Sequence, residues 1–157
     1  MLASIPSAVI ASPNADITVY ATPESISITV DPVTYNFTFV ALSATPSTTT
    51  SYFTIDNTSN TQTDQTISVT TTTWAGGVNW THSETATPGA DTAGLKANQG
   101  GSWGSGDVIV RNGSPLYIAE NQTADTDFSF GLKLWAPISF GDYLQKSITV
   151  RVTAVTG

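Results

Sequence analysis

The sequence predicts an all-β fold, an antiparallel β-sandwich or jelly roll of about 8–10 strands with an N-terminal extension strand. Three observations predict it. Apolar and polar residues alternate through most of the chain, turn residues separate the alternating runs, and Thr and Ser make up 44 of the 157 residues. Thr is β-branched, which suits the half-buried face of a strand.

Eight alternating runs are expected to form strands. In chain order they are residues 25–31 (SISITVD), 34–41 (TYNFTFVA), 51–56 (SYFTID), 66–74 (TISVTTTTW), 107–112 (DVIVRN), 116–120 (LYIAE), 127–135 (DFSFGLKLW) and 147–155 (SITVRVTAV). The segments between them are rich in Gly, Pro, Asn and Asp, which favour turns. Only residues 87–98 (TPGADTAGLKAN) are interpreted as a short helical turn. In the run DFSFGLKLW, the alternation puts Lys133 on the polar face.

The charge balance excludes several classes of partner. The net charge is −7, from 5 basic and 12 acidic residues, so no basic stripe is available for nucleic acid or anionic lipid.

The chain has no Cys, which excludes disulfides and thiolate metal sites. No apolar run is long enough to predict a membrane span. Charged residues are only 11% of the chain, and we expect an extracellular or cell-surface location.

No pattern of catalytic residues is present, so we do not expect an enzyme or a cofactor. His82 is the single histidine, no GxSxG motif accompanies it, and its polar surroundings favour a surface or turn position. The same scarcity of His and Cys argues against a transition-metal site. Glu120, Asp125 and Asp127 share one loop, but their spacing matches no standard calcium loop, and solvation of a turn is the simpler interpretation.

The four tryptophans offer one alternative function, a carbohydrate-binding or adhesin module. Exposed aromatic rings on β-sandwiches can stack on sugar rings. Trp103 lies between glycines in a predicted loop and is the candidate sugar contact. Trp74 and Trp135 are expected to close the ends of the core instead.

Five asparagines stand in the N-x-S/T pattern that accepts N-linked glycans. They are Asn36, Asn57, Asn79, Asn112 and Asn121. If glycans are attached covalently at these sites, all five side chains must lie on the solvent side. Five of the eight asparagines in the chain follow the pattern.

Residues 1–15 differ from residues 16–157, which are expected to form a single sandwich domain. The first fifteen residues carry no charged side chain. They lack the basic region and long apolar stretch of a complete secretory signal, which leaves a signal remnant, an edge strand of the same domain, or a donor strand for a neighbour as interpretations. Pro6 and Pro13 suit an edge or an exit path. In a donor strand, the residues that fill the neighbour's pockets would be Leu2, Ile5, Val9 and Ile10.

Three segments resemble exported, Cys-free β-sandwich proteins of bacteria and archaea. The segments are ITVYATPESISITVDP, FTIDNTSNTQTDQTISVTTTTWAGGVNW and GLKLWAPISFGDYLQKSITVRVTA. This class includes the pilin-like subunits of archaeal bundling pili and the matrix-fibre proteins related to camelysin. The resemblance implies that an N-terminal strand leaves its own domain and completes the sheet of the next copy.

We therefore expect a structural subunit of an extracellular filament or surface layer. Its partners would be other copies of itself, joined head to tail through residues 1–15. A viral capsid jelly roll shares the fold, but such proteins usually carry a basic arm, and none is present here.

Overall fold

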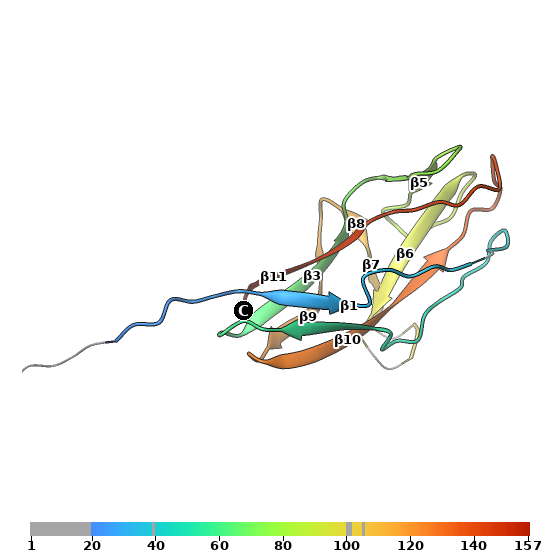
Figure 1. Cartoon of the computed structure of the whole chain (residues 1–157). Coiled ribbons are helices and arrows are strands. Elements are labelled where there is room, and N and C mark those ends of the chain that lie inside the picture. Colours follow the sequence, from blue (N-terminus) through green and yellow to red (C-terminus); the bar gives the residue numbers. More distant parts are fainter. Residues whose placement is uncertain (1–19, 39, 100–101, 105) are drawn as a thin grey trace, which may run out of the picture.

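The computed structural model describes residues 20–38, 40–99, 102–104 and 106–157, which fold into two packed β-sheets (Figure 1). The strands in these ranges are β1 (Ile28–Asp31), β2 (Phe53–Asn57), β3 (Thr63–Val69), β4 (Thr73–Trp74), β5 (Trp80–His82), β6 (Thr92–Asn98), β7 (Val108–Ile109), β8 (Arg111–Asn112), β9 (Leu116–Gln122), β10 (Thr126–Trp135) and β11 (Val150–Thr156). The all-β sandwich prediction is confirmed.

The first sheet has seven strands in the order β1-β2-β10-β6-β5-β4, with β7 also paired to β6. Its longest strand, β10, pairs with β2 through its first half and with β6 through its second half. The segment before β2 extends this sheet, because Thr48 N donates to Leu132 O (2.9 Å) and Leu134 N donates to Pro46 O (2.9 Å). All strand pairs of this sheet are antiparallel except β5 with β6.

The second sheet has four strands, and β3 is at its centre. β11 pairs antiparallel with β3 along the full length of both strands. On the other side of β3, β8 pairs in parallel and β9 pairs antiparallel. The two sheets therefore mix parallel and antiparallel pairs, whereas the sequence predicted antiparallel strands alone.

The core lies between the sheets and is built from their inward-facing side chains. Ile55 and Ile67, from opposite sheets, are 0% exposed. Phe53 stacks on Phe130 with ring centroids 5.1 Å apart, which joins the two neighbouring strands β2 and β10. Burying side chains of this size contributes about 1.5–3 kcal/mol each. The alternation that predicted the strands is therefore the alternation that fills the core.

Residues 34–41 were predicted as a strand, and the described part of this segment is not one. Asn36 Oδ1 accepts a hydrogen bond from Thr38 N (2.8 Å), and Thr38 has a φ of 58°. This local turn breaks the extended backbone. The aromatic side chains still pack, since Tyr35 contacts Phe37 and Tyr52 edge to face. The pattern predicted packing correctly and sheet pairing wrongly.

Residues 87–98 were interpreted as a helical turn, and this was wrong. They contain β6, a seven-residue strand inside the first sheet. Ala93, Leu95 and Ala97 alternate into the core with at most 1% exposure. Gly94 is required because a Cβ there would lie 2.5 Å from the Cα of Ala86, which crosses over the strand. Ala and Gly have low strand preference, so composition hid a clear period of two.

Candidate functional site

One long side of the sandwich is lined by the outermost strand of each sheet, β1 from the first and β11 from the second. The two strands lie side by side (Figure 1). Within the described ranges, no further strand pairs with the outer edge of either one. An edge of this kind presents unpaired backbone N–H and C=O groups. We call the β1 and β11 edges together the open side, and it can accept an additional strand.

The register of β11 shows which of its backbone groups face outward. Thr70 N donates to Thr149 O (3.0 Å), so odd-numbered residues along this pairing exchange hydrogen bonds with β3. The hydrogen bond from Thr66 Oγ1 to Thr153 O (3.3 Å) agrees with this assignment. The even-numbered residues turn their N–H and C=O groups toward the open side. These are Val150, Val152, Ala154 and Thr156.

Apolar side chains along the open side are only half-buried. They are Ile28 and Val30 of β1, together with Val150 and Val152 of β11. The next strand inward in each sheet is fully covered, as Ile55 and Ile67 show. Removing the remaining apolar surface from water stabilises by about 25 cal/mol per Å². An added strand would therefore gain both backbone hydrogen bonds and apolar burial here.

The chain that leads into β1 runs away from the body of the sandwich (Figure 1). Residues 20–27 are all exposed, and Tyr20 is 89% exposed. Asn60 fixes the inner end of this segment: its Oδ1 accepts from Ser25 N (2.8 Å), and its Nδ2 donates to Pro23 O (3.0 Å). The predicted partner-binding residues precede this segment and lie outside the described residues. They are Leu2, Ile5, Val9 and Ile10.

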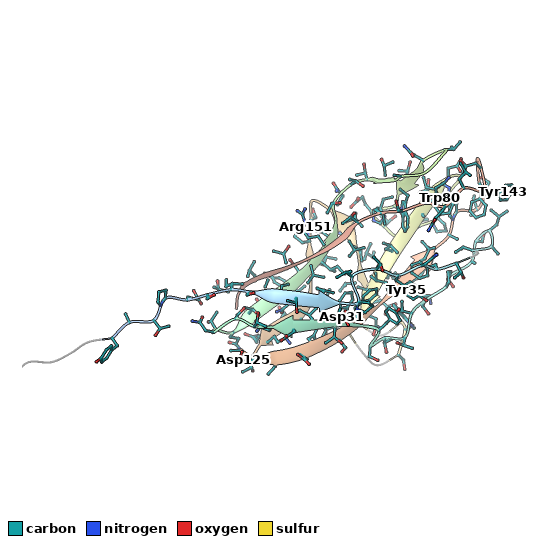
Figure 2. All side chains as sticks on the ribbon, in the orientation of Figure 1. Asp31, Tyr35, Trp80, Asp125, Tyr143 and Arg151 are labelled. Atoms are coloured by element: carbon teal, nitrogen blue, oxygen red, sulfur yellow. The ribbon has the colours of Figure 1, made fainter. Side chains whose placement is uncertain are left out.

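The opposite end of the sandwich carries exposed apolar side chains. Tyr143 is 95% exposed and projects at this end, far from residues 20–27 (Figure 2). Leu144 (62%) and Val78 (49%) lie on the two loops that meet there. We call these three residues the distal patch. Sequence reasoning missed it, because the pattern does not show that the two loops meet.

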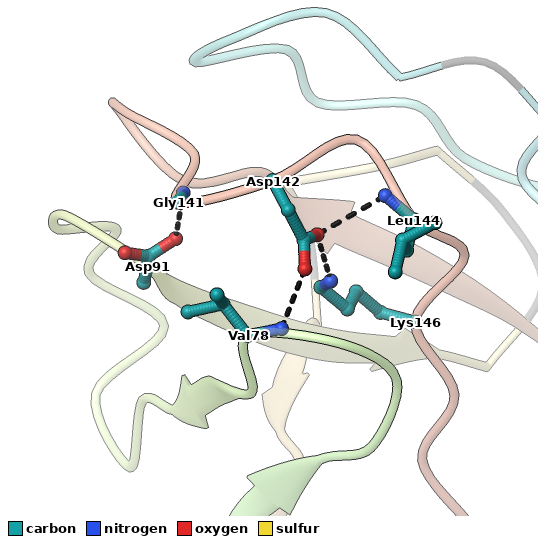
Figure 3. Close-up of polar contacts among 6 residues, drawn as sticks. All are labelled: Val78, Asp91, Gly141, Asp142, Leu144 and Lys146. Atoms are coloured by element: carbon teal, nitrogen blue, oxygen red, sulfur yellow. Dashed lines mark hydrogen bonds and ion pairs between the residues drawn. The ribbon is translucent and has the colours of Figure 1, made fainter.

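Asp142 holds the distal loops together (Figure 3). Its carboxylate accepts hydrogen bonds from Lys146 Nζ, from Val78 N (2.5 Å) and from Leu144 N (3.0 Å). The hydrogen bond from Lys146, followed by that from Val78 N, keeps the pKa of Asp142 below its ordinary value of 3.8. A second carboxylate, Asp91, accepts from Gly141 N (2.6 Å). The segment between β10 and β11 is thus tied at Gly141 and Asp142 to two neighbouring loops.

Asn57 does not meet the condition for a glycan acceptor in the folded domain. Its residue is 0% exposed, and its Nδ2 donates to Gln122 O (3.3 Å) and Thr123 O (3.0 Å). The expectation that all five sequon asparagines lie on the solvent side is therefore wrong for this residue. The Asn57 amide lies in β2 and holds the chain at residues 122 and 123 by these hydrogen bonds. The N-x-S/T pattern itself carries no information on burial.

The other four sequon asparagines are at least partly accessible. Asn36, Asn79 and Asn121 are exposed. Asn112 is half-buried, and its Nδ2 donates to Val69 O (3.1 Å). Three of the acceptors are therefore exposed, and the side-chain amide of Asn112 is held by a hydrogen bond within the second sheet.

The tryptophans divide into two pairs. Trp74 and Trp80 are buried at 6% and 8% exposure, and Trp80 stacks on Phe140. Trp135 was expected in the core, but it is half-buried at an odd-numbered position of β10, whereas Leu132 and Leu134 face inward. Trp103 is also half-buried. Lys133 is near both rings, 5.7 Å from the Trp103 centroid and 5.1 Å from the Trp135 centroid.

His82 was expected at the surface, and this was wrong. It is 3% exposed in β5, and its Nε2 lies 2.7 Å from Val110 O. The side chain thus joins the first sheet to the segment between β7 and β8. Glu120, Asp125 and Asp127 form no cluster of metal ligands, and the described ranges contain no group of three His, Cys, Asp or Glu side chains that could hold a metal ion.

No protein-family model, characterised protein or solved structure matches this chain significantly. Within the described ranges, no helix has the length and apolar character needed to cross a membrane.

Proposed function

We propose that the protein is a structural subunit of an extracellular filament or surface layer, joined head to tail by strand donation. Residues 1–15 of one copy add to the open side of the next copy, and the protein has no catalytic role. The sequence supports this through a first segment that has no charged side chain and contains the apolar residues Leu2, Ile5, Val9 and Ile10. The fold supports it through two strand edges on one side of the sandwich, β1 and β11, with which no other strand in the described part of the chain pairs.

One observation carries the proposal: residues 20–22, before the contacts with Asn60, are exposed and lead away from the domain (Figure 1), while the domain's own open side has half-buried apolar side chains. A segment that leaves one domain is well placed to reach another. In strand addition, backbone hydrogen bonds supply affinity and alternate side chains fill pockets. Residues 2–10 in a strand would span about 30 Å, which is sufficient to cover the seven residues of β11.

The two ends of the sandwich support a head-to-tail arrangement. The N-terminal segment leaves one end, and the distal patch of Val78, Tyr143 and Leu144 lies at the other. A contact between unlike ends is heterologous, and it propagates into a filament unless the rotation closes a ring. Exposed Asn36, Asn79 and Asn121 are the proposed glycan acceptors on such a filament.

Deletion of residues 2–12 tests the proposal. The truncated chain is expected to stay folded and to be monomeric, because the deletion leaves every described strand intact. Circular dichroism reports the fold, and analytical ultracentrifugation with electron microscopy reports assembly. Filaments formed by the truncated chain would refute strand donation.

Disulfide trapping distinguishes donation to a neighbour from pairing within one chain. The natural chain has no Cys, so two introduced thiols have no background. One variant carries a cysteine in the first segment (Val9→Cys or Ile10→Cys), and a second carries Ala154→Cys on the open side. Mixed under oxidising conditions, they are expected to form heterodimers. A control mixture with Thr85→Cys, an exposed residue outside the open side, should not. Absence of heterodimers for both positions would contradict donation to β11.

A further inference from the structure

The outer face of the first sheet carries two lysines directly opposite one another. Lys96 of β6 and Lys133 of β10 are cross-strand partners in the antiparallel register. Lys96 Nζ lies 4.7 Å from the ring centroid of Trp135, and Lys133 Nζ lies 5.1 Å from the same centroid. Lys133 Nζ is also 5.7 Å from the Trp103 centroid. Two ammonium groups and two indole rings therefore form one cluster, which we call the Lys–Trp cluster.

This cluster is unusual for the composition of the chain. The protein has 5 basic residues against 12 acidic ones, yet two of the basic residues form a single cross-strand pair. Like charges directly opposite one another destabilise a sheet. Among the described residues, the one ion pair joins Lys146 to Asp142, so within those ranges no carboxylate lies at ion-pair distance from Lys96 or Lys133. The indole faces offset part of the repulsion through cation–π attraction.

The Trp103 ring is held in position. Its Nε1 donates to Thr48 O (3.3 Å), on the segment that pairs with β10. Asp107 fixes the neighbouring backbone, because its carboxylate accepts from Gly104 N (3.1 Å) and from Asn98 Nδ2 (2.5 Å). A ring that is ordered before binding loses less conformational freedom when a ligand stacks on it.

We propose that the Lys–Trp cluster binds an acidic sugar, a pyranose that carries a carboxylate. The carboxylate is held between Lys96 and Lys133 as a charge-assisted pair. The apolar face of the pyranose stacks on Trp103, because both ammonium groups already lie over the Trp135 ring. Such a ligand relieves the repulsion between the two ammonium groups, which a neutral sugar does not. The net charge of −7 and the two lysines make a nucleic-acid backbone a poor ligand by comparison. This site is separate from the open side and does not depend on strand donation.

Matched oligosaccharides test the proposal on the full-length chain. Tetragalacturonate and a glucuronate-containing hyaluronan tetrasaccharide supply the carboxylate, and fully methyl-esterified tetragalacturonate supplies the same ring without the charge. Binding is followed by tryptophan fluorescence, to which the accessible rings Trp103 and Trp135 respond, and by calorimetry. We expect saturable binding of at least one acid, with the ester at least about ten-fold weaker, and weaker acid binding as salt rises.

Variants connect that binding to the cluster. The double variant Lys96→Gln/Lys133→Gln should lose at least about ten-fold in affinity for the acid, whereas Arg151→Gln, which removes an exposed positive charge on β11, should bind as the natural protein does. Thermal unfolding confirms that both variants fold. If the double variant does not fold, the comparison of acid with ester decides alone. No saturable binding of either acid, equal binding of acid and ester, or a folded double variant with unchanged affinity would each overturn the proposal.

Discussion

A pair of proline substitutions at adjacent residues of β11 tests the assignment of its free edge. In the register with β3, Thr153 belongs to a hydrogen-bonded pair with Thr66, whereas Ala154 turns its N–H toward the open side. Proline has no N–H, and strands tolerate it where that group faces away from the sheet. Thr153→Pro therefore removes a hydrogen bond to β3, whereas Ala154→Pro removes none.

The expected magnitudes follow from this geometry. Thr153→Pro leaves the carbonyl of the buried Thr66 without its partner, which costs about 1–3 kcal/mol. For a domain of this size, that loss lowers Tm by roughly 2–12 °C. Ala154→Pro removes no hydrogen bond to β3 and should reduce the free energy of unfolding by less than Thr153→Pro does, because an edge strand accepts proline where its N–H faces away from the sheet. Under strand donation, Ala154→Pro should nevertheless weaken assembly. The strand added by the neighbouring copy would lose its hydrogen bond from the Ala154 N–H of β11.

Urea unfolding and sedimentation velocity measure the two effects on the same samples. Ala154→Ser serves as the control, since it keeps the N–H and the small side chain. Equal destabilisation by the two prolines would refute the register-based assignment of the edge. Assembly of Ala154→Pro at the level of the natural chain would refute addition of the donor to β11.

Three further predictions concern stability. Ile55→Ala should cost about 2–5 kcal/mol, whereas Ile26→Ala, at 43% exposure, should cost less than about 0.5 kcal/mol; chemical unfolding of both compares buried with exposed isoleucine. Gly131→Ala would place a Cβ 2.3 Å from Thr49 O, and overpacking of this kind costs about 1–3 kcal/mol in the same assay. Because the pKa of Asp142 is lowered in the folded chain, its stabilisation is present above its ordinary pKa of 3.8 and is lost as pH falls through the lower folded value. The difference in stability between the natural chain and Asp142→Asn should therefore shrink as pH falls below about 5, and a difference that does not shrink contradicts this role.

Strands rich in β-branched and aromatic residues could be predicted from the sequence. The run DFSFGLKLW forms most of β10, and SITVRVTAV contains most of β11. β6 could not be predicted in this way. Its core positions are Ala and Leu, and the residues between these positions are Gly94 and Lys96. Tertiary contacts on both sides of β6, with β10 and with β5 and β7, outweigh its low intrinsic preference.

The candidate sites depended on information that one strand alone does not contain. The sequence indicated that Lys133 lies on the polar face of its strand and that Trp103 is a loop residue. Their proximity, and the position of Lys96 opposite Lys133, follow from the pairing of β6 with β10. Likewise, the alternation in β11 shows which side chains face the core, but the free N–H groups follow only from its register with β3.

The open side and the first segment have complementary compositions, and this complementarity predicts how one charge would act. β11 has a single charged residue, Arg151, and no proline, so it lacks most of the features that keep exposed edges from pairing. A strand that covers Val150 and Val152 must bring apolar side chains with it, because burying an unpaired charge costs more than the new contacts supply. Val9→Asp should therefore abolish assembly and leave the unfolding of the monomer unchanged, whereas Val9→Leu should assemble. Assembly by the Asp variant, measured by sedimentation, would mean that this residue does not enter the neighbour's core.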